Sequence, residues 1–133
     1  MLIPTDPCAV YRGSWCPFCQ GYLKTLQSLS TDIQAAGGKV FAVTSEAASE
    51  LPKMRTASGY TGETIVDPEN VLAIELKRRG VIDVAISEHK GYPSGMVQPA
   101  VLIGAKNKLW YRWAIIPGTV SSAIPSYKRA MLT

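Results

Sequence analysis

Two cysteines three residues apart, in Trp15-Cys16-Pro17-Phe18-Cys19, constrain the fold and chemistry of this chain more than any other feature. An apolar run before the motif, residues 8–11, predicts a buried strand, and the pattern after it predicts an amphipathic helix over 17–36. If that helix begins at Pro17, Cys16 is its N-cap, where unpaired N–H groups and the helix dipole stabilise a thiolate. Cys19 then lies one turn inside the helix, within reach of an intramolecular disulfide. The motif therefore favours redox chemistry.

The remaining pattern predicts alternating strands and helices followed by a hairpin. We expect strands at 39–44 and 64–66, helices at 49–58 and 67–79, the second capped by Asp67, and an extended stretch at 81–86. A loop at 87–98, a hairpin with strands at 100–104 and 109–114, and a helix at 123–131 complete the chain. This order predicts one α/β domain over residues 1–133, with a parallel crossover, an antiparallel pair and helices on both faces of a mixed sheet.

The position of the cysteine motif in this order resembles the thioredoxin fold. More locally, four stretches are similar to the redoxin branch that contains the peroxiredoxin-like alkyl hydroperoxide reductase and thiol-specific antioxidant proteins: residues 11–19, Tyr22-Leu23, residues 66–69 and residues 98–103. The resemblance implies a catalytic Cys16, a resolving Cys19 and a cis peptide bond before Pro99.

Three positions differ from the patterns of these relatives. The family's peroxidases carry Thr or Ser three residues before the reactive cysteine, and this chain has Gly13. They also place an arginine near the thiolate, for which Arg12 and Arg112 are the candidates here. Thioredoxins have a buried acid at the position of Val10. The differences favour thiol-disulfide exchange by Cys16 and Cys19 as the main hypothesis, with peroxide reduction through a sulfenic acid at Cys16 as the alternative.

Five residues are expected to bind the substrate. Trp15 would form a flat apolar rim beside an exposed Cys16 thiol, and Pro17 follows that thiol directly. Arg12 lies on the approach to the motif, and the backbone at Gln98, before Pro99, would pair with an extended substrate segment.

Other interpretations of the cysteines stay open. The pair could be structural, or half of a zinc site, although only Cys8 and His89 remain as scattered soft ligands, so we expect no metal and no cofactor. Cys8 fits a buried strand and His89 a solvated loop. A binding module, or an enzyme that uses the same fold for other small-molecule chemistry, is the third class of function.

Composition limits the partners. The net charge of +4 is mild, and Lys77-Arg78-Arg79 and Lys128-Arg129 stand at expected helix C-termini, so we expect no nucleic acid. The N-terminus has no signal-peptide pattern and no segment is long enough to span a bilayer, which predicts a cytoplasmic protein without a membrane partner. The expected partners are a disulfide-bearing protein or small molecule as substrate, or a peroxide under the alternative hypothesis, together with a thiol electron donor. An open sheet edge also allows pairing with a second copy as a homodimer.

Overall fold

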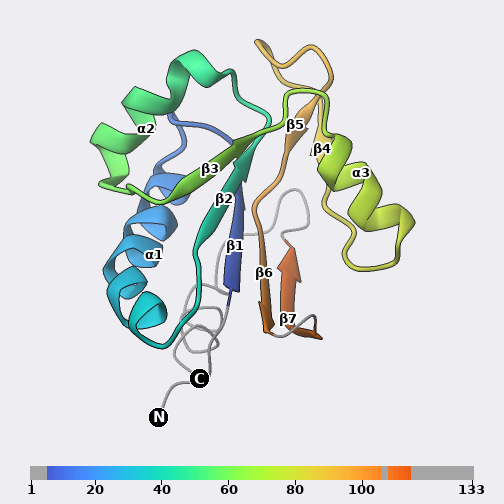
Figure 1. The fold of residues 1–133 in the computed structure, drawn as a ribbon. Coiled ribbons are helices and arrows are strands. Elements are labelled where there is room, and N and C mark those ends of the chain that lie inside the picture. The colour runs from blue at the N-terminus through green and yellow to red at the C-terminus, as the bar shows by residue number, and fades with distance from the viewer. Residues whose placement is uncertain (1–5, 106–107, 115–133) are drawn as a thin grey trace.

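A computed structural model describes residues 6–105 and 108–114, and its central feature is a five-stranded mixed sheet. The strands lie in the order β3-β2-β1-β6-β7 (Figure 1). Their bounds are β1 Asp6–Tyr11, β2 Phe41–Thr44, β3 Glu63–Val66, β6 Ala100–Ala105 and β7 Lys108–Ala114. The first three strands are parallel, whereas β6 is antiparallel to both β1 and β7. The predicted crossover and hairpin are therefore confirmed.

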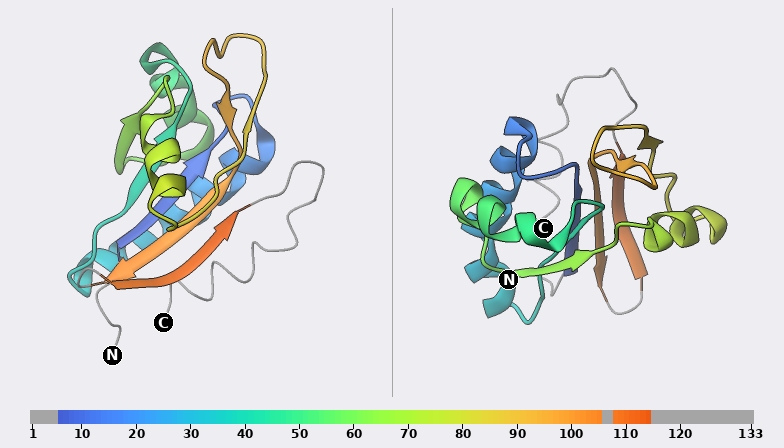
Figure 2. Two further views of the ribbon diagram at one scale, coloured as in Figure 1. Left: turned by 90° about the vertical axis from the view of Figure 1, so that its right-hand side faces the viewer. Right: turned by 90° about the horizontal axis from the view of Figure 1, so that it is seen from above.

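Helices cover both faces of the sheet, as predicted. On one face lie α1, Pro17–Ala35, and α2, Leu51–Ser58, which follows a short 3-10 turn η1, Ala48–Glu50. On the other face lies α3, Val71–Arg78 (Figures 1 and 2). The period-2 alternation of β1 explains the two cores: Ala9 and Tyr11 pack with α1, and Val10 packs on the side of α3.

The long helix α1 contributes more residues to the first core than any other element. Its buried residues recur at helical spacing, so one stripe faces the sheet: Cys19, Tyr22, Leu23, Leu26, Leu29, Ser30 and Ile33. The helix ends as predicted at the glycine pair, where Gly37 has a φ of 91° and the N–H of Gly38 donates to the carbonyl of Ile33.

Two parts of the structure differ from the predicted pattern. The helix expected from Asp67 begins only at Val71, because Asp67-Pro68-Glu69-Asn70 forms a turn in which Asn70 has a φ of 59°. The N-cap is therefore Asn70 and not Asp67, although the carboxylate of Asp67 still accepts from the N–H groups of Val71 and Leu72. Two short antiparallel strands also extend into the expected loop at 87–98: β4, Ile86–Ser87, which starts at the last residue of the expected extended stretch, and β5, Met96–Val97. The helix expected at 123–131, with Lys128-Arg129, lies outside the described residues.

Sheet and loops meet at one end of the molecule. The chain leaves the upper end of β1 in Figure 1 and turns into α1, and the loop between β4 and β5 lies above the same end of the sheet. The cysteine motif and residues 88–95, far apart in sequence, are thereby brought together.

Candidate active site

Cys16 caps the N-terminus of α1, as predicted. Its backbone is extended, with φ −87° and ψ 112°, and its sulfur accepts a hydrogen bond from the N–H of Cys19 at 3.4 Å. Pro17 occupies the first helical position, where a missing N–H has no cost. The local sequence alone is sufficient to build this cap, because all of its parts lie within one helical turn.

Both cysteines of the motif are reduced and buried. Cys16 is 3% exposed and Cys19 is fully buried, so the prediction of an exposed Cys16 thiol beside Trp15 is wrong. The sulfur of Cys19 accepts from the N–H of Arg12 at 3.3 Å. Cys8 is half-buried and packs against the core on the opposite face of the sheet, so it belongs to a different environment from the pair.

Different surroundings give the three thiols different pKa values. A hydrogen bond from the thiol of Cys19 lowers the pKa of Cys16 to about 6, aided by the N–H of Cys19 and by Arg12, whereas burial opposes the shift. Burial raises the pKa of Cys19 strongly, and the hydrogen bond and negative charge of Cys16 raise it further. Burial alone raises the pKa of Cys8 to about 11. Cys16 is the thiolate at neutral pH, and Cys19 is a proton-bearing neighbour.

Arg12 is the arginine at the thiolate. Its Nη1 lies 3.9 Å from the sulfur of Cys16, and its Nε donates to Oε1 of Gln98 at 2.8 Å. Gln98 is held in turn, since its Nε2 donates to Oγ of Ser87 at 3.1 Å. The guanidinium therefore faces the sulfur from a position supported by β4 and by the segment before β6.

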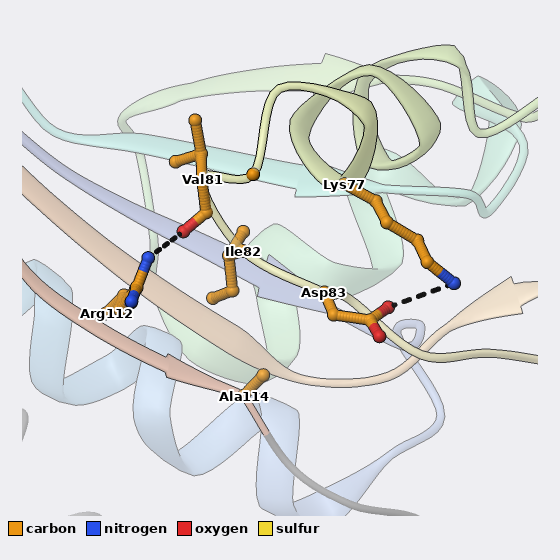
Figure 3. Close-up of a pocket in the computed structure, with 7 residues that line it drawn as sticks. Lys77, Val81, Ile82, Asp83, Arg112 and Ala114 are labelled. Atoms are coloured by element: carbon orange, nitrogen blue, oxygen red, sulfur yellow. Dashed lines mark hydrogen bonds and ion pairs between the residues drawn. The ribbon is translucent and has the colours of Figure 1, made fainter.

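Arg112, the other candidate, lies elsewhere. It donates to the carbonyl of Val81 at 2.8 Å and lines a pocket of about 540 Å³ (Figure 3). In the same pocket Lys77 forms an exposed ion pair with Asp83 at 3.6 Å. None of the pocket's residues is a cysteine or one of the predicted substrate-binding residues.

The prediction of a cis peptide bond before Pro99 is wrong. No cis peptide bond occurs in the described residues 6–105 and 108–114, so Gln98 and Pro99 are joined by a trans bond. The N–H of Gln98 donates to the carbonyl of Ala85 at 2.8 Å, and its side chain bonds Arg12 and Ser87. The backbone N–H of Gln98, part of the backbone that was expected to pair with a substrate segment, is therefore occupied within the protein.

The predicted substrate-binding residues separate into two groups. Trp15 and Pro17 are exposed on either side of Cys16, and Arg12 is half-buried beside it. Gln98 and Pro99 are buried. The first group forms the outer surface of the site, and Gln98 supports Arg12 from within.

Several residues of the site were not found from sequence. His89, expected to be a solvated side chain, is exposed but stacks on the indole of Trp15 with ring centroids 4.8 Å apart. The hydroxyl of Tyr92 accepts from Nε1 of Trp15 at 2.9 Å, and the carboxylate of Glu46 accepts from the N–H and hydroxyl of Ser14. These residues lie between 32 and 77 positions from their partners, and no spacing rule in the sequence connects them.

A shallow groove of about 290 Å³ lies beside this aromatic surface. It is lined by Trp15, Glu46, Ala47, Glu50, Lys53, His89, Lys90, Gly91 and Tyr92. Burial raises the pKa of Glu46, although the hydrogen bonds from Ser14 act in the opposite direction. The groove brings aromatic rings and charges of both signs to the edge of the cysteine site.

Two further features concern only the part of the chain that the structure describes. Within residues 6–105 and 108–114, no three His, Cys, Asp or Glu side chains gather in a cluster that could bind a metal ion. Over the same residues, every helix is too short or too polar to cross a lipid bilayer.

The sequence also matches a known family model. The AhpC/TSA family model matches residues 9–107, which include the cysteine motif and most of the sheet. The chain belongs to the AhpC/TSA family. A comparison with curated protein sequences found no match.

Solved structures of peroxiredoxins share the fold of this AhpC/TSA member. The bacterioferritin comigratory protein of Xanthomonas campestris has a TM-score of 0.70 at 11% identity, over 96% of this chain and 77% of that one. AhpC of Enterococcus faecalis has a TM-score of 0.69 at 14% identity, over 95% and 72%. A mutant of peroxiredoxin 6 from Arenicola marina has a TM-score of 0.67 at 19% identity, over 96% and 60%. The fold is thioredoxin-like, as predicted.

Family membership and fold together define the class of enzyme. This AhpC/TSA protein is a peroxiredoxin-like oxidoreductase, which means either a thiol-disulfide oxidoreductase or a thiol-dependent peroxidase. Peroxide reduction, the alternative reaction from the sequence, agrees better with membership of the AhpC/TSA family than disulfide exchange does.

Proposed function

We propose that this protein reduces hydroperoxides, with Cys16 as the attacking thiolate and Cys19 as the resolving thiol. The observation that carries the proposal is Arg12, whose Nη1 faces the sulfur of Cys16 at 3.9 Å. The sequence left open whether any arginine could reach the thiolate. A fixed cation there lowers the pKa of Cys16 and can stabilise the negative charge that develops on the leaving oxygen of a peroxide.

The first half-reaction oxidises Cys16. Its thiolate attacks one oxygen of the hydroperoxide, the O–O bond breaks, and the S–O bond of a sulfenic acid forms. The leaving alkoxide or hydroxide takes one proton, so the peroxide becomes an alcohol or water and Cys16 has lost two electrons. Arg12 is positioned to face the charge on the departing oxygen.

The second half-reaction closes a disulfide. The sulfur of Cys19 attacks the sulfur of the sulfenic acid, and the hydroxyl leaves as water with the proton of the Cys19 thiol. Oxidation of Cys16 removes the negative charge that helps to raise the pKa of Cys19, so the resolving thiol loses its proton more easily at this stage. A thiol donor then supplies two electrons and two protons to restore both cysteines.

Burial of the pair also supports a small oxidant. With Cys16 only 3% exposed, a folded protein would have to bring its own disulfide into line with a nearly covered sulfur. A hydroperoxide needs to present a single oxygen. The same burial protects the sulfenic acid from other nucleophiles until Cys19 reacts.

Thiol-disulfide exchange is the second candidate, and Ser14 is the observation in its favour. The hydroxyl of Ser14 donates to Glu46 at 3.1 Å, so it is already occupied, and Gly13 has no hydroxyl to offer a peroxide. In exchange, Cys16 would attack a substrate disulfide and Cys19 would release the reduced substrate. The thiol donor, homodimerisation and a cytoplasmic location remain predictions.

Stopped-flow oxidation of Cys16 by hydrogen peroxide, in parallel with reduction of a small disulfide, tests the proposal. We expect peroxide to react at least about 10²-fold faster with Cys16 than with free cysteine at the same pH. The Cys19→Ser variant should accumulate a sulfenic acid that a dione probe traps, and the wild type should instead lose two hydrogens as the internal disulfide forms. If peroxide oxidises Cys16 no faster than free cysteine while the protein reduces the small disulfide rapidly, the function is thiol-disulfide exchange and not peroxide reduction.

A further inference from the structure

The turn that presents Cys16 is crowded at the one position that has no side chain. An ideal Cβ built on Gly13 would lie closer than 3.0 Å to the hydroxyl of Tyr92, to Nε1 of Trp15 and to a carboxylate oxygen of Glu46. Real Cβ atoms essentially never have such neighbours. Because Gly13 has no side chain, three polar groups can pack around its Cβ position, and the Tyr92 hydroxyl lies nearest to that position.

The Tyr92 hydroxyl connects both sides of this turn. It donates to the carbonyl of Arg12 at 2.9 Å and accepts from Nε1 of Trp15 at 2.9 Å. Arg12 carries the guanidinium that faces the thiolate, and Trp15 directly precedes Cys16. The carbonyl of Gly13 also accepts from the N–H of Cys16 at 3.2 Å, so a movement of the turn moves the reactive cysteine.

Tyr92 is itself held by its loop. Its N–H donates to the carbonyl of His89, and the ring of His89 packs edge-on against its own at 5.4 Å. Asn70, fully buried, donates from its side-chain amide to the carbonyls of Ser94 and Gly95 on the same loop. The hydroxyl is thus presented to the cysteine turn by a segment bonded to the body of the fold.

We propose that Tyr92 is a positioning residue of the peroxide site, whose hydroxyl takes the space left by Gly13 and holds Arg12 and Trp15 around Cys16. The inference rests on the proposed function for the reaction that it serves. Its geometric part concerns the turn alone and applies to any reaction of the Cys16 thiolate.

The main test is a double-mutant cycle between positions 13 and 92. Tyr92→Phe removes only the hydroxyl, and we expect the rate of Cys16 oxidation by hydrogen peroxide to fall on the order of tenfold to a hundredfold. Gly13→Ala should cost at least as much in the wild type, because its methyl group meets that hydroxyl. In the Tyr92→Phe background the same change should cost clearly less, because the nearest contact is gone and the indole of Trp15, 40% exposed, can turn outward, which leaves only the contact with the Glu46 carboxylate at 2.8 Å.

Tyr60 offers a matched control. It is buried, its hydroxyl donates to the carbonyl of Glu63, and it crowds the Cβ position of Gly62 just as Tyr92 crowds that of Gly13. Tyr60→Phe should lower the melting temperature without changing the reactivity of Cys16. An effect of Tyr92→Phe on melting temperature alone, or an equal cost of Gly13→Ala in both backgrounds, would overturn the proposal.

A peroxide-independent measurement separates this inference from the proposed function. The pH profile of Cys16 alkylation reports how Arg12 and the turn support the thiolate, and we expect Tyr92→Phe to move its midpoint to higher pH. If the wild type reacts slowly with peroxide, the proposed function is wrong. A shifted alkylation midpoint in Tyr92→Phe, together with a non-additive double-mutant cycle measured on the alkylation rate, would still support the positioning role. An unshifted midpoint with additive rates would refute the role of Tyr92 even in an active peroxidase.

Discussion

Arg12 donates from Nε to Oε1 of Gln98 at 2.8 Å, although 86 residues separate the two in sequence. This bond leaves Nη1 directed at the sulfur of Cys16, 3.9 Å away. A long, flexible cation is thereby held in one orientation, which reduces the conformational entropy it would otherwise lose on reaction. Gln98 supports the arginine through its side chain, and its backbone contact with a substrate stays a prediction.

Replacing Gln98 by Ala should free the Arg12 guanidinium. We expect the pKa of Cys16 to rise above its wild-type value of about 6 and peroxide oxidation to slow severalfold. Alkylation of Cys16 measured against pH gives the pKa. Ser87→Ala, which removes only the acceptor behind Gln98, should have a smaller effect; equal effects would mean that the Arg12 contact is unimportant.

The two arginines that sequence left as candidates make a matched pair of variants. Arg12→Met should lower the rate of Cys16 oxidation by about 10²-fold, because the charge facing the sulfur is lost. Arg112→Met should leave the rate unchanged, since Arg112 is exposed and bonded to the carbonyl of Val81. Stopped-flow measurements at a pH where Cys16 stays a thiolate compare them; similar rates for both variants would contradict the assignment.

Reactivity of the wild type should follow the pKa of Cys16. Because that pKa is lowered to about 6, the thiolate is present above pH 6 and is lost by protonation as the pH falls through 6. At pH 5 only about one tenth of the neutral-pH alkylation rate should remain. Cys19 and Cys8, whose pKa values are raised, should stay unlabelled at neutral pH. Peptide mass spectrometry after limited alkylation identifies the labelled residue, and label on Cys19 first would reverse the roles.

Cys19 should influence Cys16 even before any disulfide forms. Its thiol hydrogen bond is the largest cause of the lowered pKa of Cys16, so Cys19→Ala should raise that pKa. Cys19→Ser keeps a hydroxyl that can donate to the thiolate and should raise it less. The alkylation midpoints of the two variants test this order, and identical midpoints would show that the backbone and Arg12 suffice.

Glu46 should stabilise the folded protein through Ser14. Glu46→Ala would leave the buried N–H and hydroxyl of Ser14 without their acceptor, at a cost of about 1–3 kcal/mol in the free energy of unfolding. Within residues 6–105 and 108–114, Glu50 is the N-cap of α2 but its side chain makes no capping hydrogen bond, so Glu50→Ala should change stability by no more than about 0.5 kcal/mol. Urea unfolding of the reduced proteins measures both, and equal losses would argue against the Ser14 contact.

Features that depend on neighbours along the chain could be predicted from the amino-acid sequence. The strand at Cys8, the N-cap at Cys16, the first-turn Pro17 and the amphipathic stripe of α1 all follow from spacings within one or two helical turns, and each was predicted. The thioredoxin-like order of strands and helices follows from the same periodicities. At Asp67-Pro68 the sequence correctly indicated a carboxylate that bonds the first N–H groups of the helix, but the N-cap is Asn70 and the helix starts later than predicted.

The side chains around the thiolate could not be predicted in this way, because the fold brings them together from distant parts of the chain. Arg12 meets Gln98, Ser14 meets Glu46, and Trp15 meets Tyr92 across 86, 32 and 77 residues, and each bond joins loops at the end of the sheet near Cys16. No periodicity links such pairs, because loop side chains are oriented by the particular path of each connection. The place of Cys16 at a helix N-terminus could therefore be predicted from the sequence, whereas the groups that surround its sulfur became known only when the fold brought them together.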